Sequence, residues 1–382
     1  MELQQKKYLI TGMTPNAGGI EAFIMNFLRY ADRKKLHFDF IVNFEETIAF
    51  EEELLDYGCS IYRLPGRKKH PIFHYIQYFR FFKTYAKVYD GIYCNLLSLT
   101  NIDDMRFAYK NRIPNIIAHA HNNNDVENPC LGIRPFLHKL HKKRVIKSST
   151  LLLSCSESAG KWMFGKDTSF QVINNAIDLG KFVFSELDRN IIRRKNNIDP
   201  STLVLGSVGR LETQKNPLFL IDIFYHVKQI CHDSMFLHIG NGSFYDEMKK
   251  KIARYHLQDS YILLGSLEDT SPFYSAMDVF LFPSLYEGLG ISLIEAQAND
   301  VVCFISDTIP EEAILIENKC FSFPLSMPAV DWAKKILQQE DLIKKERRDN
   351  FTLISDKGYD VKTEIKKLER IICNEKNKAN YT

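Results

Sequence analysis

Short apolar runs alternate with segments of helical periodicity along most of the chain. The runs are bounded by glycine or polar residues, which predicts buried strands at 7–11, 37–43, 60–64, 90–95, 115–118, 151–155, 203–210, 235–239, 261–264, 279–282 and 301–305. Apolar residues recur every three or four positions between them, which predicts helices near 20–31, 51–55, 74–87, 217–231, 244–255 and 291–298. This alternation predicts parallel, doubly wound α/β sheets.

The strand–helix series runs once in each half of the 382-residue chain, so we expect two Rossmann-like domains facing a central cleft. The first should span residues 1–178 and the second 201–360. The polar stretch 179–200, rich in Arg, Lys and Asn, is the expected linker. Residues 361–382 should form a C-terminal helix or tail that could pack back on the first domain. Ligands are expected at the carboxyl ends of the strands.

Charge is distributed unevenly. Residues 1–175 hold 24 Lys/Arg and 17 Asp/Glu, a charge of +7, whereas the remainder holds 26 and 30, a charge of −4. Basic clusters at 63–70 and 134–147 are either solvated surface or sites for nucleic acid, anionic lipid or a phosphorylated substrate. No nucleic-acid motif is present, so nucleic acid is not an expected partner.

We expect the protein to be cytoplasmic. No stretch approaches the roughly 20 apolar residues that span a bilayer, and the N-terminus does not read as a signal peptide. The eight cysteines are scattered without zinc-site spacing, which favours reduced thiols.

The segment 74–83 is aromatic at helical spacing. It is either a core helix or a partly exposed apolar patch that docks on a membrane together with the basic clusters at 67–69 and 142–144. The second reading makes an anionic membrane surface a candidate partner.

Two carboxylates stand at a strand–glycine–helix junction in the second half. Glu287 opens the turn Gly288-Leu289-Gly290, and Glu295 lies eight residues after Glu287. The amino end of a helix favours phosphate, but two carboxylates would repel a bare phosphate. They suit a ligand with hydroxyls at both ends and phosphates between them, which describes a nucleotide sugar.

Two cations lie on the turn that follows the strand at 203–210. Arg210 offers a planar fork of donors and Lys215 a mobile point charge. Such a pair suits a leaving diphosphate, whose charge grows as its bond to a sugar breaks. By themselves, the two could also be solvated loop cations.

Together these segments resemble the family 4 retaining glycosyltransferases of the GT-B fold, in the form found in bacterial capsule and exopolysaccharide members. The resemblance rests on segments spread in order over nearly the whole chain: 18–21, 119–122, 155–157, 175–182, 209–216, 239–242, 264–265, 277–280 and 287–296.

The resemblance implies a role for each matching position. Arg210 and Lys215 would hold the donor diphosphate, Glu295 the ribose hydroxyls, and Glu287 the transferred sugar or the positive charge on its ring. The remaining implied donor-binding residues are glycines and one leucine: Gly18, Gly19, Gly209, Gly242, Gly265, Gly288, Leu289 and Gly290.

Two histidines, His119 and His121, follow a first-domain strand. An H-x-H pair could ligate a metal, but no third ligand is evident. One could be structural, and the resemblance places one beside the transferred sugar and acceptor. His121 is the first candidate and His119 the second.

Two departures from the family pattern are noted. Ala176 replaces a glycine in the 175–178 motif, and Asn299-Asp300 stands where many relatives have a small residue and glycine.

The expected reaction is retaining transfer of a hexose or N-acetylhexosamine from a nucleotide-diphosphate sugar, in first place a UDP-sugar. The acceptor would be a hydroxyl of a lipid-linked or growing bacterial surface glycan. No Asp-x-Asp pair occurs, so no divalent metal or other cofactor is expected. The alternatives are a catalytically silent sugar-nucleotide-binding partner and a nicotinamide-dependent dehydrogenase, for which the G-x-G-x-x-G spacing is lacking.

Overall fold

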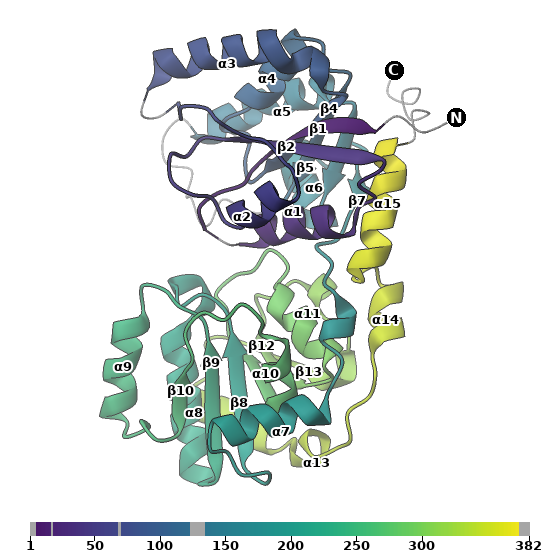
Figure 1. The fold of residues 1–382 in the computed structure, drawn as a ribbon. Helices are drawn as coiled ribbons and strands as arrows, with labels where there is room; N and C mark the ends of the chain where they lie inside the picture. The colour runs from purple at the N-terminus through teal and green to yellow at the C-terminus, as the bar shows by residue number, and fades with distance from the viewer. Residues whose placement is uncertain (1–4, 17, 68–69, 123–133, 374–382) are drawn as a thin grey trace. The chain divides into compact units, whose positions relative to one another are not determined.

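The computed structural model describes residues 5–16, 18–67, 70–122 and 134–373. The chain divides into two units (Figure 1). The first takes residues up to Ala176 and resumes at Val361, and the second spans Ile177–Asp360.

The first unit is built on a seven-stranded parallel sheet of order β3-β2-β1-β4-β5-β6-β7. The strands are β1 (Lys6–Thr11), β2 (Leu36–Val42), β3 (Ile61–Arg63), β4 (Gly91–Leu96), β5 (Asn115–Ala120), β6 (Leu151–Ser154) and β7 (Gln171–Val172). The order in which the chain adds strands reverses between β1 and β4, and ligands of doubly wound folds bind at such a switch point.

Helices of the first unit belong to two apolar clusters. One contains residues of α1 (Gly19–Tyr30), α2 (Glu51–Asp56) and α15 (Val361–Cys373). The other contains residues of α3 (Pro71–Tyr85), α4 (Asp103–Lys110), α5 (Arg134–Ser148) and α6 (Glu157–Phe164). Helix α15, from the far end of the sequence, is therefore part of the first unit's core.

The second unit contains a six-stranded parallel sheet of order β10-β9-β8-β11-β12-β13. Its strands are β8 (Leu203–Val208), β9 (Ser234–Ile239), β10 (Tyr261–Leu263), β11 (Val279–Phe282), β12 (Val302–Ser306) and β13 (Cys320–Phe323). Its helices are α7 (Glu186–Lys195), α8 (Pro217–Ile230), α9 (Tyr245–Arg254), α10 (Ser271–Ala276), α11 (Ile291–Ala298), α12 (Ala329–Leu337), α13 (Glu340–Ile343) and α14 (Phe351–Asp356).

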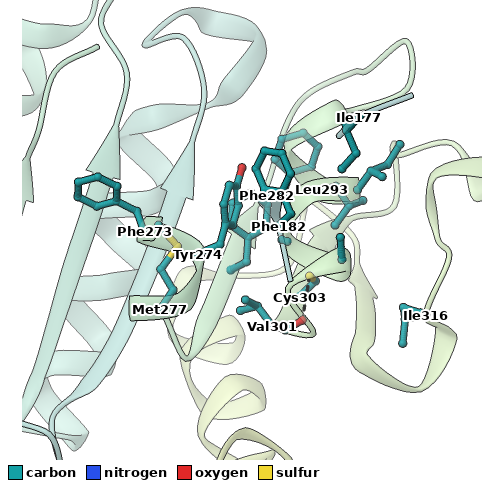
Figure 2. Close-up of a cluster of buried hydrophobic side chains, with 14 of the residues drawn as sticks. Ile177, Phe182, Phe273, Tyr274, Met277, Phe282, Leu293, Val301, Cys303 and Ile316 are labelled. Carbon is teal, nitrogen blue, oxygen red and sulfur yellow. Dashed lines mark hydrogen bonds between the residues drawn. The ribbon is translucent and has the colours of Figure 1, made fainter. Parts of the chain in front are cut away.

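Strand order in both sheets is the doubly wound 3-2-1-4-5-6 pattern, with one further strand, β7, at the edge of the first. Figure 2 shows part of the second unit's core, where Tyr274, Phe282 and Leu293 belong to one buried cluster. This cluster also includes Leu289 and Ile294, which lie in the segment that carries Glu287 and Glu295.

The stretch 179–200 was expected to be a linker, but the structure places it inside the second unit. It contains α7, whose Arg193 is 2% exposed. The Arg193 guanidinium donates to Oδ2 of Asp278 at 2.7 Å and to the carbonyl of Ala276 at 3.1 Å. Arg193 of this helix is thus a buried cation with matched acceptors, whereas Glu186, Arg194 and Lys195 are exposed.

Helix α3 has two apolar faces. His74, Tyr78, Phe81 and Phe82 are buried against the sheet. On the other side, large side chains are exposed, with Ile72 at 78% and Phe79 at 56%. The core-helix reading is therefore confirmed for one face, and the other face is a partly exposed apolar patch, whose docking on a membrane stays a prediction. Lys68 and Lys69 of the neighbouring basic cluster lie outside the described residues. None of the helices in the described part of the chain has the length and apolarity needed to cross a membrane.

Candidate functional site

Two turns of the second unit are tied together at the carboxyl ends of β8 and β11. The amide of Leu285 donates to the carbonyl of Gln214 at 2.8 Å, and the Asn216 side chain donates to the carbonyl of Pro283 at 3.3 Å. Asn216 adopts a left-handed conformation, with φ of 52°, just before α8 begins. These bonds bring the predicted cation turn against the predicted carboxylate turn.

Lys215 and Glu287 form an ion pair where the turns meet. The Nζ of Lys215 lies 2.6 Å from Oε1 of Glu287, whose side chain is only 6% exposed. The ammonium also lies 4.6 Å from the centre of the Phe282 ring. A largely buried carboxylate needs such a partner to remain charged.

Gln214 links the second predicted cation to the same carboxylate. Its amide nitrogen donates to Oε2 of Glu287 at 3.4 Å and to the carbonyl of Tyr286 at 3.1 Å. Its amide oxygen accepts from Nη2 of Arg210 at 3.1 Å. Arg210, Lys215 and Glu287 therefore belong to one network of polar contacts.

Two glycines allow the turn after β9 to pack on Gly209. A Cβ on Gly240 would lie 1.8 Å from the carbonyl oxygen of Gly209, and one on Gly242 would lie 2.5 Å from that of Leu211. Both distances are impossible contacts. The structure thus shows a close-packing role for Gly242, which we had expected to bind the donor.

Other predicted glycines border open space. A Cβ on Gly265 or Gly288 would meet nothing within 4 Å, and Gly265 has a φ of +71°, which favours glycine. Gly290 has a φ of +84° and precedes α11. Leu289 lies between these glycines in the sequence, but its side chain is buried in the core.

Glu295 is held by a tyrosine. The hydroxyl of Tyr274, which is fully buried, donates to Oε2 of Glu295 at 2.6 Å. Burial raises the pKa of Glu295 to about 7, although the Tyr274 bond and the Lys215 charge both lower it. The electrostatic influence of Lys215 extends to Glu295, so both glutamates share this cation's field.

Gly18 and Gly19 lie at the start of α1 in the first unit, above buried polar groups. Glu21 is 5% exposed and accepts from the hydroxyl of Thr14 at 2.6 Å. A Cβ on Gly18 would lie 3.0 Å from Oε2 of Glu21. Gly18 therefore allows the chain to pass close to this carboxylate.

The two histidines differ in environment. His119 is fully buried, and its Nδ1 lies 2.7 Å from the Tyr93 hydroxyl. His121 is half-buried, follows β5, and its Nε2 lies 2.8 Å from Oδ1 of Asn95. Burial lowers the pKa of both imidazoles, that of His121 to about 3. Both are therefore neutral at physiological pH.

No group of three or more His, Cys, Asp or Glu side chains within the described ranges could hold a metal ion.

The second unit matches a known enzyme family. The family described as "Glycosyl transferases group 1" matches residues 188–351. This part of the chain is a group 1 glycosyl transferase domain. It contains the whole Arg210, Lys215, Glu287 and Glu295 constellation.

Similar proteins extend the likeness beyond the transferase domain. EpsF of Bacillus subtilis (strain 168) is 26% identical over 375 residues, which are 96% of each chain. An Escherichia coli protein, UDP-Gal:alpha-D-GlcNAc-diphosphoundecaprenol alpha-1,3-galactosyltransferase, is 29% identical over 178 residues, 45% of each chain.

A solved structure supports the fold of both units. The crystal structure of Anabaena HepE in complex with UDP and glucose matches with a TM-score of 0.75 at 17% identity, over 96% of this chain and 99% of that chain. The predicted GT-B class, with two Rossmann-like α/β domains, is confirmed.

Sequence reasoning missed three residues that support the predicted ones. Gln214 binds Glu287, Tyr274 binds Glu295, and Asn95 contacts His121. Gln214 lies inside the segment 209–216, which is part of the family resemblance. Its place beside Lys215 could therefore have marked it as a candidate site residue. Tyr274 and Asn95 lie 21 and 26 residues from their partners, and local patterns say nothing about such contacts.

Proposed function

We propose that this protein is a retaining glycosyltransferase that uses a UDP-sugar to extend a lipid-linked or growing bacterial surface glycan. The observation that carries the proposal is the position of Lys215, in contact with Glu287 and within electrostatic reach of Glu295. A cation between two carboxylates is complementary to a diphosphate flanked by two hydroxyl-bearing sugars.

Charge stabilisation is the main catalytic effect in this proposal. As the bond between the anomeric carbon and the diphosphate oxygen breaks, Arg210 and Lys215 offset the growing negative charge. The acceptor hydroxyl forms the new bond and gives its proton to the leaving diphosphate. Glu287 binds the transferred sugar and Glu295 binds the ribose. The remaining rate acceleration comes from positioning the donor.

Relatives support the nucleotide and the acceptor class. HepE was crystallised with UDP and glucose, and the Escherichia coli relative is named for a UDP-galactose donor and a diphosphoundecaprenol-linked acceptor. We assign a hexose or N-acetylhexosamine to this chain by the same reasoning.

A membrane-facing surface in the first unit fits a lipid-linked acceptor. Exposed apolar side chains lie on three helices of one layer: Ile72, Phe73, Ile76 and Phe79 of α3, Tyr109 of α4, and Phe136 and Leu140 of α5. Exposed cations accompany them: Arg80, Lys83, Arg106, Lys110, Lys139, Lys143 and Arg144.

Carboxylates are scarce on this surface. The sequences of α3 and α5 contain no Asp or Glu, and Asp103 of α4 is buried beside Arg67 and His74. Apolar side chains surrounded by cations favour an anionic bilayer over water. We therefore propose peripheral attachment to the inner face of the cell membrane.

A catalytically silent sugar-nucleotide-binding partner remains the second candidate. Turnover separates the two. The purified protein is incubated with candidate UDP-sugars and a lipid-linked glycan extract, and UDP release is measured. We expect release with the wild type and its loss in Glu287→Ala and Lys215→Ala. Unchanged turnover in both variants would show that the site is wrongly assigned.

A further inference from the structure

Asn95 lies at the carboxyl end of β4, where β1 and β5 end beside it. Its Nδ2 donates to the main-chain oxygen of Thr11 at 2.8 Å. Gly12 has a φ of +111°, and a Cβ there would lie 2.7 Å from Cβ of Asn95. Glycine at position 12 is therefore what lets the buried amide approach the end of β1.

The contact with Thr11 determines which way the amide faces. A carbonyl oxygen can only accept, so the NH2 group of Asn95 must point to Thr11 and Oδ1 must point to His121. Oδ1 in turn can only accept. Nε2 of His121, 2.8 Å away, must then carry the proton.

The other ring nitrogen of His121 consequently holds a lone pair. Nδ1 is buried, and it has no hydrogen-bond partner among the residues that the structure describes. The ring packs 4.0 Å from the His119 ring and 5.1 Å from the Phe23 ring, centre to centre. A buried acceptor without a donor is costly, so a ligand that supplies a donor here is favoured.

We propose that Asn95 is a positioning residue that holds His121 in the Nε2–H tautomer, so that Nδ1 accepts a hydrogen bond from a sugar hydroxyl. The proposal rests on the proposed function only for the identity of the ligand as a sugar. The low pKa of His121 agrees with this arrangement, because the imidazole stays neutral and keeps its lone pair.

Selectivity follows from the polarity of this contact. A hydroxyl can donate to Nδ1, whereas a carboxylate has no proton to donate and would face a lone pair. The site therefore favours a neutral hexose over a uronic acid at the position that His121 contacts.

The tautomer can be measured in the free protein, without a donor or an acceptor. The full chain is labelled with ¹⁵N-histidine, and long-range ¹⁵N–¹H spectra are recorded at neutral pH. The His121 signals are assigned by their loss in His121→Phe. We expect a protonated Nε2 and a bare Nδ1. A protonated Nδ1, or an average of both tautomers, would overturn the proposal even if the enzyme is active.

Variants test whether Asn95 acts through His121. Asn95→Leu should allow both tautomers and lower kcat/KM about 10-fold, the effect of roughly one hydrogen bond. In a His121→Phe background the same substitution should cause no further loss. An equal loss in both backgrounds would show a merely structural role.

Asn43→Leu is the matched control. Asn43 also donates from its amide to a main-chain carbonyl of the first unit, that of Leu64, at 3.1 Å. This variant should lose comparable stability but keep the His121 tautomer and kcat/KM. A tautomer change in this control as well would overturn the assignment to Asn95.

Discussion

Lys215 and Glu287 contact each other directly, at 2.6 Å between Nζ and Oε1, although 72 residues separate them in the sequence. The cation proposed for the diphosphate is thus also the partner of the carboxylate proposed for the sugar. Each residue therefore helps to fix the position of the other before any ligand arrives.

Removing this cation should impair both turnover and folding. Lys215→Ala leaves the nearly buried Glu287 with only its long bond from Gln214, so we expect a loss of about 1–3 kcal/mol in the free energy of unfolding. It also removes a donor aimed at developing charge, so kcat should fall about 100-fold or more. Urea denaturation and UDP release measure the two effects.

Lys251→Ala is the matched control. Its Nζ lies 2.6 Å from Oδ2 of Asp222, with a side-chain exposure of 20%, close to the 18% of Lys215. This pair is more exposed on the carboxylate side and should contribute no more than about 1 kcal/mol. Turnover should be unchanged. An equal loss of turnover in both variants would contradict a specific role for Lys215.

Donor binding should depend on pH through Glu295. With a pKa of about 7, this carboxyl is half-protonated at neutral pH, and only the ionised form accepts from two ribose hydroxyls. UDP affinity should therefore rise as the pH increases through 7 and be nearly flat in Glu295→Gln. Tyr274→Phe should move the midpoint upward, because the tyrosine bond lowers the pKa. Titration calorimetry across pH measures UDP affinity in each variant. A midpoint that is the same in Tyr274→Phe and the wild type would contradict the role of the tyrosine bond.

The carboxyl of Glu295 should also make the free energy of unfolding depend on pH in the absence of ligand. In the unfolded chain this carboxyl titrates near its usual pKa of 4.5. Between about pH 4.5 and pH 7 the folded protein therefore binds a proton that the unfolded chain has lost. Its contribution is complete below pH 4.5 and is lost as the pH rises through 7. Denaturation midpoints of the wild type and Glu295→Gln should therefore diverge over that range. Parallel curves would argue against the raised pKa.

Asp300 should be essential for stability, although the family pattern that the sequence resembles implies glycine near this position. It has a φ of +59°, and its carboxylate lies 2.6 Å from Nζ of buried Lys319 and 2.6 Å from the amide of Arg348. Asp300→Gly relieves the backbone but leaves the ammonium buried without its partner. We expect a loss of about 3–5 kcal/mol, measured by urea denaturation.

The double variant Asp300→Gly/Lys319→Met supplies the control, because it removes both charges of the pair. Part of the lost stability should return. A single variant as stable as the wild type would show that the Asn299-Asp300 departure is incidental.

Activity should not require a divalent metal, because Arg210 and Lys215 provide the positive charge for the diphosphate. UDP release should persist in excess EDTA. Loss of release that magnesium restores would contradict this expectation.

The apolar face of α3 should determine attachment to anionic vesicles. Ile76→Glu with Phe79→Glu places two carboxylates on it. We expect vesicle binding to weaken about 100-fold or more, because each buried apolar side chain contributes about 1.5–3 kcal/mol and about 1.4 kcal/mol is a factor of ten. Co-sedimentation with phosphatidylglycerol-containing vesicles measures this change.

Leu187→Glu with Ile191→Glu is the control for added charge. Both residues are exposed on α7 of the second unit, at 67% and 47%. If the two double variants bind vesicles equally weakly, net charge and not the α3 face would be responsible.

Sequence patterns predicted the strands well, because buried parallel strands are continuous apolar runs such as Val279–Phe282. They failed for α7, whose buried face combines Ile192 with a charged residue, Arg193, that apolar periodicity does not reveal. They also could not reveal that Asp300 adopts a left-handed conformation. Its role depends on Lys319 and Arg348, which local spacing does not bring near it.

The return of α15 to the first unit has a consequence for synthesis on the ribosome. Its Glu364 accepts from the amide of Asn174, and its Glu369 lies 2.7 Å from Nζ of Lys35. The first unit therefore lacks part of its core until residues 361–373 have been translated. The second unit is one continuous segment, Ile177–Asp360. It can therefore complete its folding before α15 has been translated, while the first unit is still incomplete.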